Sequence, residues 1–232
     1  MKSLFVTMTG KEKRAGWCLL GLGVFLVLGF KTAEISEFFS LILLETILFT
    51  GVLIFFKDFL RESMEVPFTG FGKILKTALL GLIATQLAVL LTNDLAFFYL
   101  PRYFSYDETG PHFLSAQQEF LSAALSVNGP ITAVVWIFLL PVVTEVLHRG
   151  LIFGSLPFKS RTISCLLGTL IFAALRTVFL VNSQDTVYAV LNFLQFLPIG
   201  IFFTWIYSAT ETIFTPILAH MLLNAVSIYT MR

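Results

Sequence analysis

Long apolar stretches alternate with short polar segments along most of the chain. Seven of these stretches have the length and continuity of single helices: Ala15–Phe30, Phe38–Phe56, Ile74–Leu91, Ile131–Leu147, Ile163–Val181, Val187–Tyr207 and Ile213–Tyr229. Most of them approach the roughly 20 residues that cross about 30 Å of hydrocarbon. A backbone in that solvent has to satisfy its own hydrogen bonds, so each stretch is expected to be helical. The pattern predicts an all-α, polytopic membrane helix bundle of about seven spans.

The connection from Leu100 to Pro130 is the longest one and has its own periodicity. Apolar residues recur at helical spacing between polar ones, at Phe113/Leu114, Phe120/Leu121 and Ala124/Leu125. This spacing predicts a short amphipathic helix on the outer membrane surface, which caps the bundle rather than docking a partner. We therefore divide the chain into residues 1–130, a three-span region with an external amphipathic loop, and residues 131–232, a four-span core.

Composition supports a bilayer as the main solvent. Hydrophobic residues make up 57% of the 232 residues, charged residues only 12%, and mean hydropathy is +0.88. Soluble domains carry about twice that share of charge. The balance of 15 Lys and Arg against 14 Asp and Glu gives no basic field for nucleic acid, so nucleic acid is excluded as a partner.

The basic residues of the loops predict the orientation of the chain. Eleven of them fall before span one, around the loop after span two, or after span four: Lys2, Lys11, Lys13, Arg14, Lys57, Arg61, Lys73, Lys76, Arg149, Lys159 and Arg161. The alternate side receives only three, which are Lys31, Arg102 and Arg232. Because Lys and Arg accumulate on the cytoplasmic side, we expect a multi-pass cell-membrane protein with a cytoplasmic N-terminus and an extracytoplasmic C-terminus.

A few polar residues interrupt the apolar spans, where an ionisable group is expensive and is a functional candidate by default. They are Glu45, Glu145, Arg149, Arg176, His220 and Asn224. Glu145 and Arg149 share a helix face and can form an ion pair, which is either self-satisfied or functional. His220 and Asn224 have the same spacing, and either join helices by hydrogen bonds or belong to a site. For Glu45 a structural partner or a hydrated crevice is the favoured interpretation.

Three motifs around these residues resemble the CPBP family, the CAAX-protease and bacteriocin-processing (Abi) membrane proteins. The segment from Pro141 to Gly154 resembles the first motif, Glu-Glu-x-x-x-Arg-Gly, at the end of an apolar helix. Leu170–Arg176 is similar to the second motif, Phe-x-x-x-His, and His220 with Asn224 matches the third, His-x-x-x-Asn. The resemblance covers residues 131 to 228 and implies a CPBP-like four-helix core that encloses a hydrated cavity.

The resemblance also implies catalytic roles, and two of their positions are replaced. Glutamate-dependent proteolysis would place the base at position 144 and a histidine at position 176, with His220 and Asn224 as further polar support. Here position 144 is Thr and position 176 is Arg. Thr is no carboxylate base, and Arg keeps its protons. Glu145, Arg149, His220 and Asn224 are the retained motif positions and form the candidate catalytic set, without a complete active site.

Helix geometry disfavours a rewired base. Glu145 lies about 100° round the helix from Thr144 and is expected to face elsewhere unless the helix rotates or breaks. His148 is expected to lie nearer the helix face of Thr144 than that of Glu145, at the cytoplasmic opening of the cavity. Arg176 needs a counter-ion, for which Glu145 is the expected residue. With the predicted span ends, Glu145 and Arg176 would lie at depths in the bilayer that differ by roughly 12 Å. The difference becomes smaller if span four continues through Leu151–Phe153.

No metal or other cofactor is expected, since His220 and Asn224 offer one good ligand and one poor one. Three functions stay open. The first is a proteolytically inactive protein that binds and regulates a membrane protein partner, such as a sensor kinase or a cell-wall enzyme. The second is bacteriocin self-immunity, and the third is an active intramembrane endopeptidase with a rewired base. The missing acid-base residues favour the first two.

Overall fold

The computed structural model describes residues 7–33, 35–65, 70–93, 116–154, 161–180 and 186–230. These parts contain helices and no strand. The helices of the first half are α1 (Gly10–Thr32), α2 (Glu37–Phe55), α3 (Lys57–Glu65) and α4 (Phe71–Asn93). Those of the second half are α6 (Ala116–Val134), η3 (Val135–Leu139), α7 (Leu140–Glu145), η4 (Val146–Phe153), α8 (Arg161–Leu180), α9 (Thr186–Thr210) and α10 (Phe214–Thr230). The predicted all-α fold class is confirmed.

Seven apolar passages cross the bundle. Five are long and apolar enough to span a membrane, namely Gly10–Thr32, Phe38–Phe55, Phe71–Thr92, Leu121–Phe153 and Ala189–Thr210. Two shorter apolar helices, Thr162–Val178 and Phe214–Thr230, complete the set. Each has 17 residues and so extends about 25 Å, close to the thickness of the hydrocarbon core. The protein is therefore a multi-pass membrane protein, in the seven places that the apolar pattern predicts.

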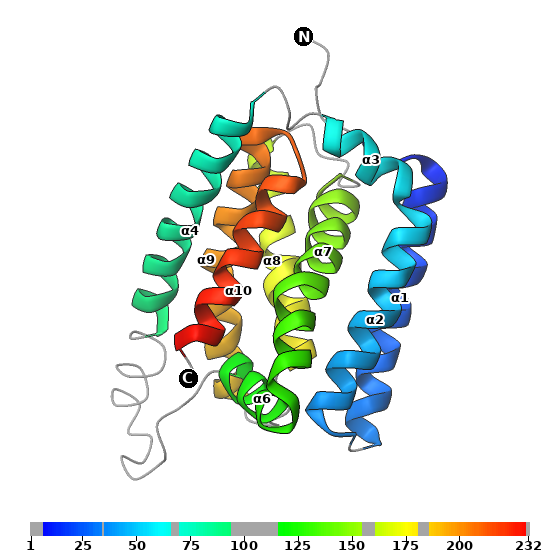
Figure 1. Ribbon diagram of the computed structural model, residues 1–232, viewed down its shortest axis with the longest axis vertical. Helices are drawn as coiled ribbons and strands as arrows, with labels where there is room; N and C mark the ends of the chain where they lie inside the picture. Colours follow the sequence, from blue (N-terminus) through cyan, green and yellow to red (C-terminus); the bar gives the residue numbers. More distant parts are fainter. Residues whose placement is uncertain are drawn as a thin grey trace.

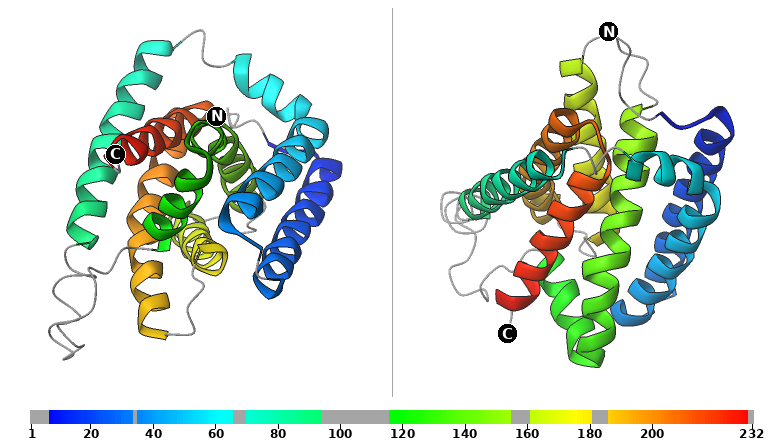
Figure 2. Two further views of the ribbon diagram at one scale, coloured as in Figure 1. Left: turned by 60° about the horizontal axis from the view of Figure 1, so that its bottom comes forward. Right: turned by 45° about the horizontal axis from the view of Figure 1, so that its top comes forward.

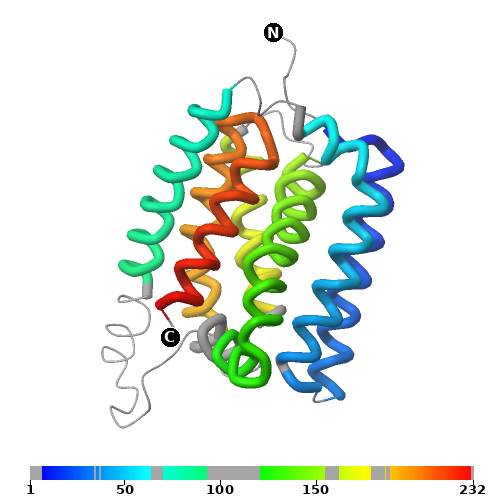
Figure 3. Tube along the Cα trace, in the orientation of Figure 1, coloured from blue at the N-terminus to red at the C-terminus, as the bar shows by residue number. Residues whose placement is uncertain are grey.

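Successive passages run in opposite directions along the bundle, as the trace in Figure 3 shows. Figures 1 and 2 place α1 and α2 on one side, α4 on the other, and the green segment from η3 to η4 between them. The helix α3 and the beginnings of α1, α4 and α8 lie at one end of the bundle, and α10 finishes at the opposite end. The loops that carry most of the predicted cytoplasmic charge thus share one end.

The helix α6 has a sharp kink at Asn128, whose backbone is not helical, with φ of −154° and ψ of 90°. Asn128 Oδ1 accepts a hydrogen bond from the Ile131 amide at 3.2 Å, and Pro130 follows in the first turn after the break. The part of α6 before the break buries Leu121 and Ala124 against Leu41, Trp136 and their neighbours. It covers one end of the bundle (Figure 1), in agreement with the predicted capping role. Phe113 and Leu114 lie outside the described residues.

Side-chain hydrogen bonds at both ends of α1 connect it to α3 and α8. Thr9 and Glu12 form a capping box at its beginning, and Glu12 Oε1 also accepts from the Phe59 amide in the first turn of α3 at 3.2 Å. At the opposite end, Lys31 Nζ donates to the Val178 carbonyl in the last turn of α8 at 2.7 Å. Between these anchors α1 packs mainly on α2 and η4, whereas α8 packs mainly on α9.

Glycine permits the close approach of α8 and α9. A Cβ atom at Gly200 would lie 2.9 Å from Thr169 Cγ2 and 3.1 Å from Phe172 Cδ1, so a larger residue would push α9 away. This close contact brings the Gly200 carbonyl, on α9, within reach of the polar residues of η4.

Candidate functional site

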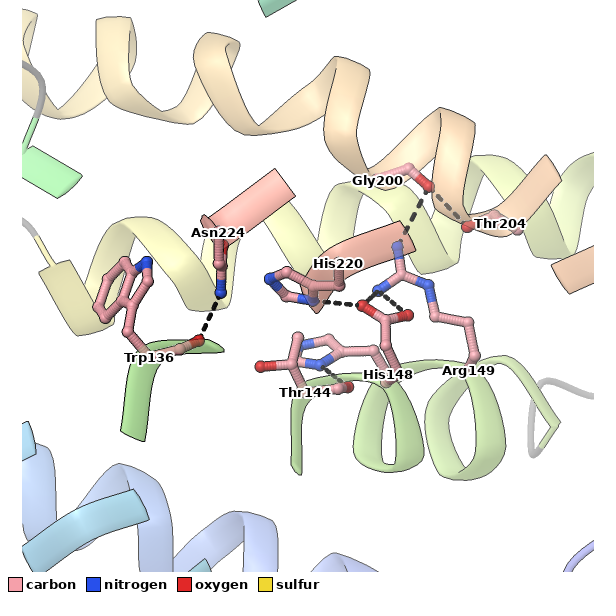
Figure 4. Close-up of polar contacts among 9 residues, drawn as sticks. Trp136, Thr144, His148, Arg149, Gly200, Thr204, His220 and Asn224 are labelled. Atoms are coloured by element: carbon pink, nitrogen blue, oxygen red, sulfur yellow. Dashed lines mark hydrogen bonds and ion pairs between the residues drawn. The ribbon is translucent and has the colours of Figure 1, made fainter. Parts of the chain in front are cut away.

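Glu145, the last residue of α7, is the centre of a buried polar network. Figure 4 shows its partners Arg149 and His220 side by side. Its side chain is fully buried, and Arg149 Nη1 lies 3.3 Å from Oε1 and 3.2 Å from Oε2. His220 Nδ1, on α10, lies 2.9 Å from Oε1. A buried carboxylate is stabilised by this kind of charge-assisted contact, which here joins α7, η4 and α10. The predicted pair of Glu145 with Arg149 is confirmed.

The guanidinium of Arg149 has three further contacts, one with a backbone carbonyl and two with aromatic rings. Nη2 donates to the Gly200 carbonyl at 3.4 Å, and that carbonyl also accepts from Thr204 Oγ1 at 2.7 Å. The guanidinium carbon lies 4.7 Å from the centre of the Phe172 ring and 5.7 Å from that of Phe203. Guanidinium over an aromatic face gains cation–π attraction, which strengthens where water is excluded. The motif spacing does not predict the contacts with the Gly200 carbonyl or with the two rings.

His220 and Asn224 both point inward, with 3% and 1% of their surfaces exposed. The prediction that they face the interior of the bundle is confirmed. A carboxylate oxygen only accepts, so the His220 Nδ1–H donates to Glu145 and the ring orientation is fixed. A carboxylate that orients an imidazole in this way is a recurrent acid-base arrangement.

Asn224 completes the hydrogen bonding of a π-helical turn. In η3 the Leu140 amide bonds to the Val135 carbonyl, five residues back. The same pattern would pair the Trp136 carbonyl with residue 141, but residue 141 is a proline and has no N–H. Asn224 Nδ2 donates a hydrogen bond to the Trp136 carbonyl at 2.7 Å. Asn224 therefore satisfies a buried backbone group and ties α10 to η3, the interhelical role that was one of its two predicted interpretations.

The opposite face of the same helix carries Thr144 and His148. His148 Nδ1 lies 2.8 Å from the Thr144 carbonyl, which can only accept, so Nδ1 carries the proton. The ring lies edge-on to Phe172, with 5.1 Å between the ring centres. As predicted, His148 shares the face of Thr144 rather than that of Glu145.

Thr144 and His148 line a cavity of about 40 Å³ between α1, α2, α7, η4 and α8. Its other polar residues are Glu45 of α2 and Arg176 of α8, and its apolar walls are Leu20, Gly23, Leu48, Val143, Leu147 and Leu175. Neither Glu145 nor His220 lines this cavity. The candidate residues therefore separate into a paired network and a cavity on two faces of one helix.

Arg176 does not pair with Glu145, and the prediction of that ion pair is wrong. Arg149 and His220 take the carboxylate of Glu145, and within the described parts of the chain no carboxylate forms an ion pair with Arg176. Instead Arg176 lies 5.9 Å from the centre of the Phe196 ring and shares the cavity with Glu45. Glu45 thus occupies a crevice, the favoured interpretation of that residue.

Glu145 faces away from Thr144, as the helix geometry predicts, because Thr144 lines the cavity and Glu145 does not. The helix is nevertheless not regular, since π-helical turns lie on both sides of α7, at η3 and η4. Such turns change the angle between successive faces and occur often at functional sites. The helix also continues to Phe153, which is the longer of the two predicted ends of span four. The same continuation brings Thr144 and Arg176 to one cavity.

Two features of this geometry, the Glu-x-x-x-Arg pair and the inward His-x-x-x-Asn pair, lie within one stretch that a family comparison recognises. Residues 126–226 match the type II CAAX prenyl endopeptidase Rce1-like family model. No curated protein and no solved structure matches the chain. The match covers less than half of the 232 residues, and the C-terminal part of this membrane protein is similar to the CAAX-protease family.

The donor set of this CAAX-protease-like segment does not fit a divalent metal. Glu145 and His220 are two suitable ligand types, but the guanidinium of Arg149 lies against the same carboxylate where a cation would bind. Among the described residues there is no group of three or more His, Cys, Asp or Glu side chains placed to hold a metal ion.

Proposed function

We propose that this CAAX-protease-like membrane protein acts by binding and regulating a membrane protein partner, such as a sensor kinase or a cell-wall enzyme, rather than by cleaving peptide bonds. The observation that carries the proposal is the separation of the two faces. The cavity receives the side chains at positions 144 and 176, where the family resemblance expects a base and a histidine and where this chain has Thr and Arg.

The position of Glu145 supports the same conclusion. A general base needs access to the water that it activates. The carboxylate of Glu145 is fully buried, contacts Arg149 and His220, and does not line the cavity.

The contact between Glu145 and His220 supports a second function, an endopeptidase with a rewired base. In this alternative Glu145 orients His220, and the imidazole exchanges the proton with water or the leaving group. This function requires water to reach the network from the cavity, past Thr144.

For the orientation we propose a cytoplasmic N-terminus. The loops with most Lys and Arg share the end of the bundle at which α1 and α4 begin and α3 lies (Figure 1). Single cysteines at Arg61 and at Asp185 give the test with a membrane-impermeant thiol reagent on intact cells, in a background with Cys18 and Cys165 replaced by Ala. The cysteine at 185 should react and that at 61 should not, and the reverse pattern would overturn the orientation.

A cleavage assay separates the two functions. The purified full-length protein in lipid vesicles is incubated with membrane-anchored peptides, next to Glu145→Gln and the cavity variant Glu45→Gln. We expect no cleavage above that of empty vesicles for any of the three. Cleavage by the native protein that is lost in Glu145→Gln, at unchanged protein level, would establish the endopeptidase and overturn the binding function.

The partner itself is tested by affinity purification in mild detergent followed by mass spectrometry. A membrane protein that co-purifies at constant stoichiometry, and whose activity in vesicles changes when the purified protein is added back, supports the proposal. An unchanged activity of every co-purifying protein would contradict it.

A further inference from the structure

The cavity between α1, α2, α7, η4 and α8 contains polar atoms that nothing in the described structure satisfies. Glu45 Oε2, His148 Nε2 and Arg176 Nε are each buried and have no hydrogen-bond partner. Glu45 and Arg176 are more than nine-tenths buried, at 7% and 9% exposure. Buried polar groups are nearly always hydrogen-bonded, so three polar atoms without a hydrogen-bond partner around one cavity indicate that a ligand binds there.

The hydrogen-bonding capacity of these atoms defines the chemistry of that ligand. Glu45 Oε2 accepts, and His148 Nε2 also accepts in the neutral ring because Nδ1 carries the proton toward the Thr144 carbonyl. Arg176 Nε carries a hydrogen and donates. The ligand therefore has two hydrogens to donate and one oxygen to accept. One carboxylate and one guanidinium leave the cavity without net charge, which favours a neutral ligand over an ion.

We propose that this cavity binds the carboxamide of an asparagine or glutamine side chain on a transmembrane helix of the partner. A carboxamide has one carbonyl acceptor and an NH₂ group with two donors, the set that Arg176, Glu45 and His148 require. The cavity of about 40 Å³ has room for about three water-sized groups, and a carboxamide has three heavy atoms. The inference rests on the proposed function, since it names the chemistry by which the partner is held.

The position of the cavity explains why the ligand comes from another transmembrane helix. Leu20 and Gly23 lie in the middle of α1, and Glu45 and Leu48 in the middle of α2. A group at that depth is reached through lipid. The helices α1 and α8 both line the cavity, pack mainly on other helices and are joined by the Lys31 hydrogen bond at one end. Gly23 adds no side chain to that wall. Amide side chains are among the groups that associate helices in membranes.

The test uses two synthetic transmembrane helices that differ at one central residue, asparagine or leucine. Each carries a fluorophore and is titrated against the labelled full-length protein in vesicles, with energy transfer as the readout. The asparagine helix should bind more tightly than the leucine helix by about 5- to 30-fold. For the double variant Glu45→Leu/Arg176→Leu the affinities of the two helices should differ by no more than about twofold, because the asparagine no longer has polar side chains to bond with in the cavity.

Two further variants keep the result interpretable. Gly23→Leu fills the cavity and leaves its charges in place, so it should abolish the preference even if the double variant fails to fold. Leu43→Ala, which changes a side chain of α2 that is 49% exposed to lipid, is the matched control and should keep the preference.

Equal binding of the two helices to the native protein would overturn the proposal and leave water as the ligand of the cavity. A preference that persists in both cavity variants would overturn it as well, because the asparagine would then bind elsewhere. Neither readout involves cleavage, so a failure here is distinct from the discovery of proteolysis, which would overturn the proposed function instead.

Discussion

The two faces of the helix from α7 to η4 differ in how their polar groups are satisfied. On one face Glu145 and Arg149 have several partners at 2.9 to 3.4 Å, drawn from η4, α9 and α10. On the other face Thr144 and His148 share a cavity with Glu45 and Arg176, where three polar atoms have no partner. Glu145 Oε2 also has no hydrogen bond but lies 3.2 Å from Arg149 Nη1. A step of one residue along the chain thus separates an ion-paired network from a cavity whose charged side chains form no ion pair in the described structure. The ion-paired network stabilises the fold, and the unpaired groups of the cavity are available for a ligand.

Removal of Glu145 should have the largest effect. In Glu145→Ala the guanidinium of Arg149 stays buried without its carboxylate, and His220 loses its acceptor. Breaking a buried ion pair in this way costs about 3 to 5 kcal/mol. Unfolding in mixed micelles titrated with SDS measures the change. The control is Glu45→Ala, which removes a buried carboxylate without a direct ion pair in the described structure, and an equal loss in both variants would contradict the comparison.

Asn224→Leu should have the next largest effect, because the Trp136 carbonyl then has no donor from α10. The loss of a hydrogen bond of this kind costs about 0.5 to 1.5 kcal/mol. The same SDS titration applies, with Ser227→Ala as the control on α10. The Ser227 hydroxyl bonds to the Leu223 carbonyl of its own helix, so its loss should change stability much less. A purely catalytic Asn224 would give a stability equal to that of the native protein.

The double variant Glu45→Leu/Arg176→Leu should show no loss of stability. It removes both charges from the cavity and replaces them with apolar side chains, an exchange that is neutral or stabilising for many buried pairs. The corresponding change of the paired face, Glu145→Leu/Arg149→Leu, should be destabilising because His220 and the Gly200 carbonyl lose their partners. If the two double variants were equally stable, the faces would not differ as described.

Thr144→Val should have the smallest effect, within about 0.5 kcal/mol. The Thr144 group that bonds to His148 is the backbone carbonyl, which valine retains. A larger loss of thermal stability would show that the hydroxyl holds a polar ligand or a water in the cavity.

Much of the fold followed from the apolar pattern. All seven predicted spans correspond to helices, because runs of this length leave the backbone no alternative in hydrocarbon. The pairing of Glu145 with Arg149 and the inward orientation of His220 and Asn224 followed from four-residue spacing, which places side chains on one helix face. These predictions depend on local geometry alone.

The error about Arg176 came from contacts between distant segments. Which groups lie near Arg176 depends on how α2 and α8 are placed on either side of the cavity, which no local spacing encodes. The π-helical turns at η3 and η4 were not predicted either, although the separation of Glu145 from Thr144 on two faces was. The Gly200 and Trp136 carbonyls are backbone groups, and a sequence does not mark which backbone groups accept hydrogen bonds from distant side chains.

The hydrogen bond from Asn224 to Trp136 also has a consequence for biogenesis. The two residues are 88 positions apart, so ribosomes deliver the fourth passage to the membrane well before α10 exists. The contact that joins η3 to α10 therefore forms only after the last helix has inserted. A nascent chain truncated before α10 would lack this link between the fourth passage and the end of the chain, which distinguishes an incomplete protein from a complete one.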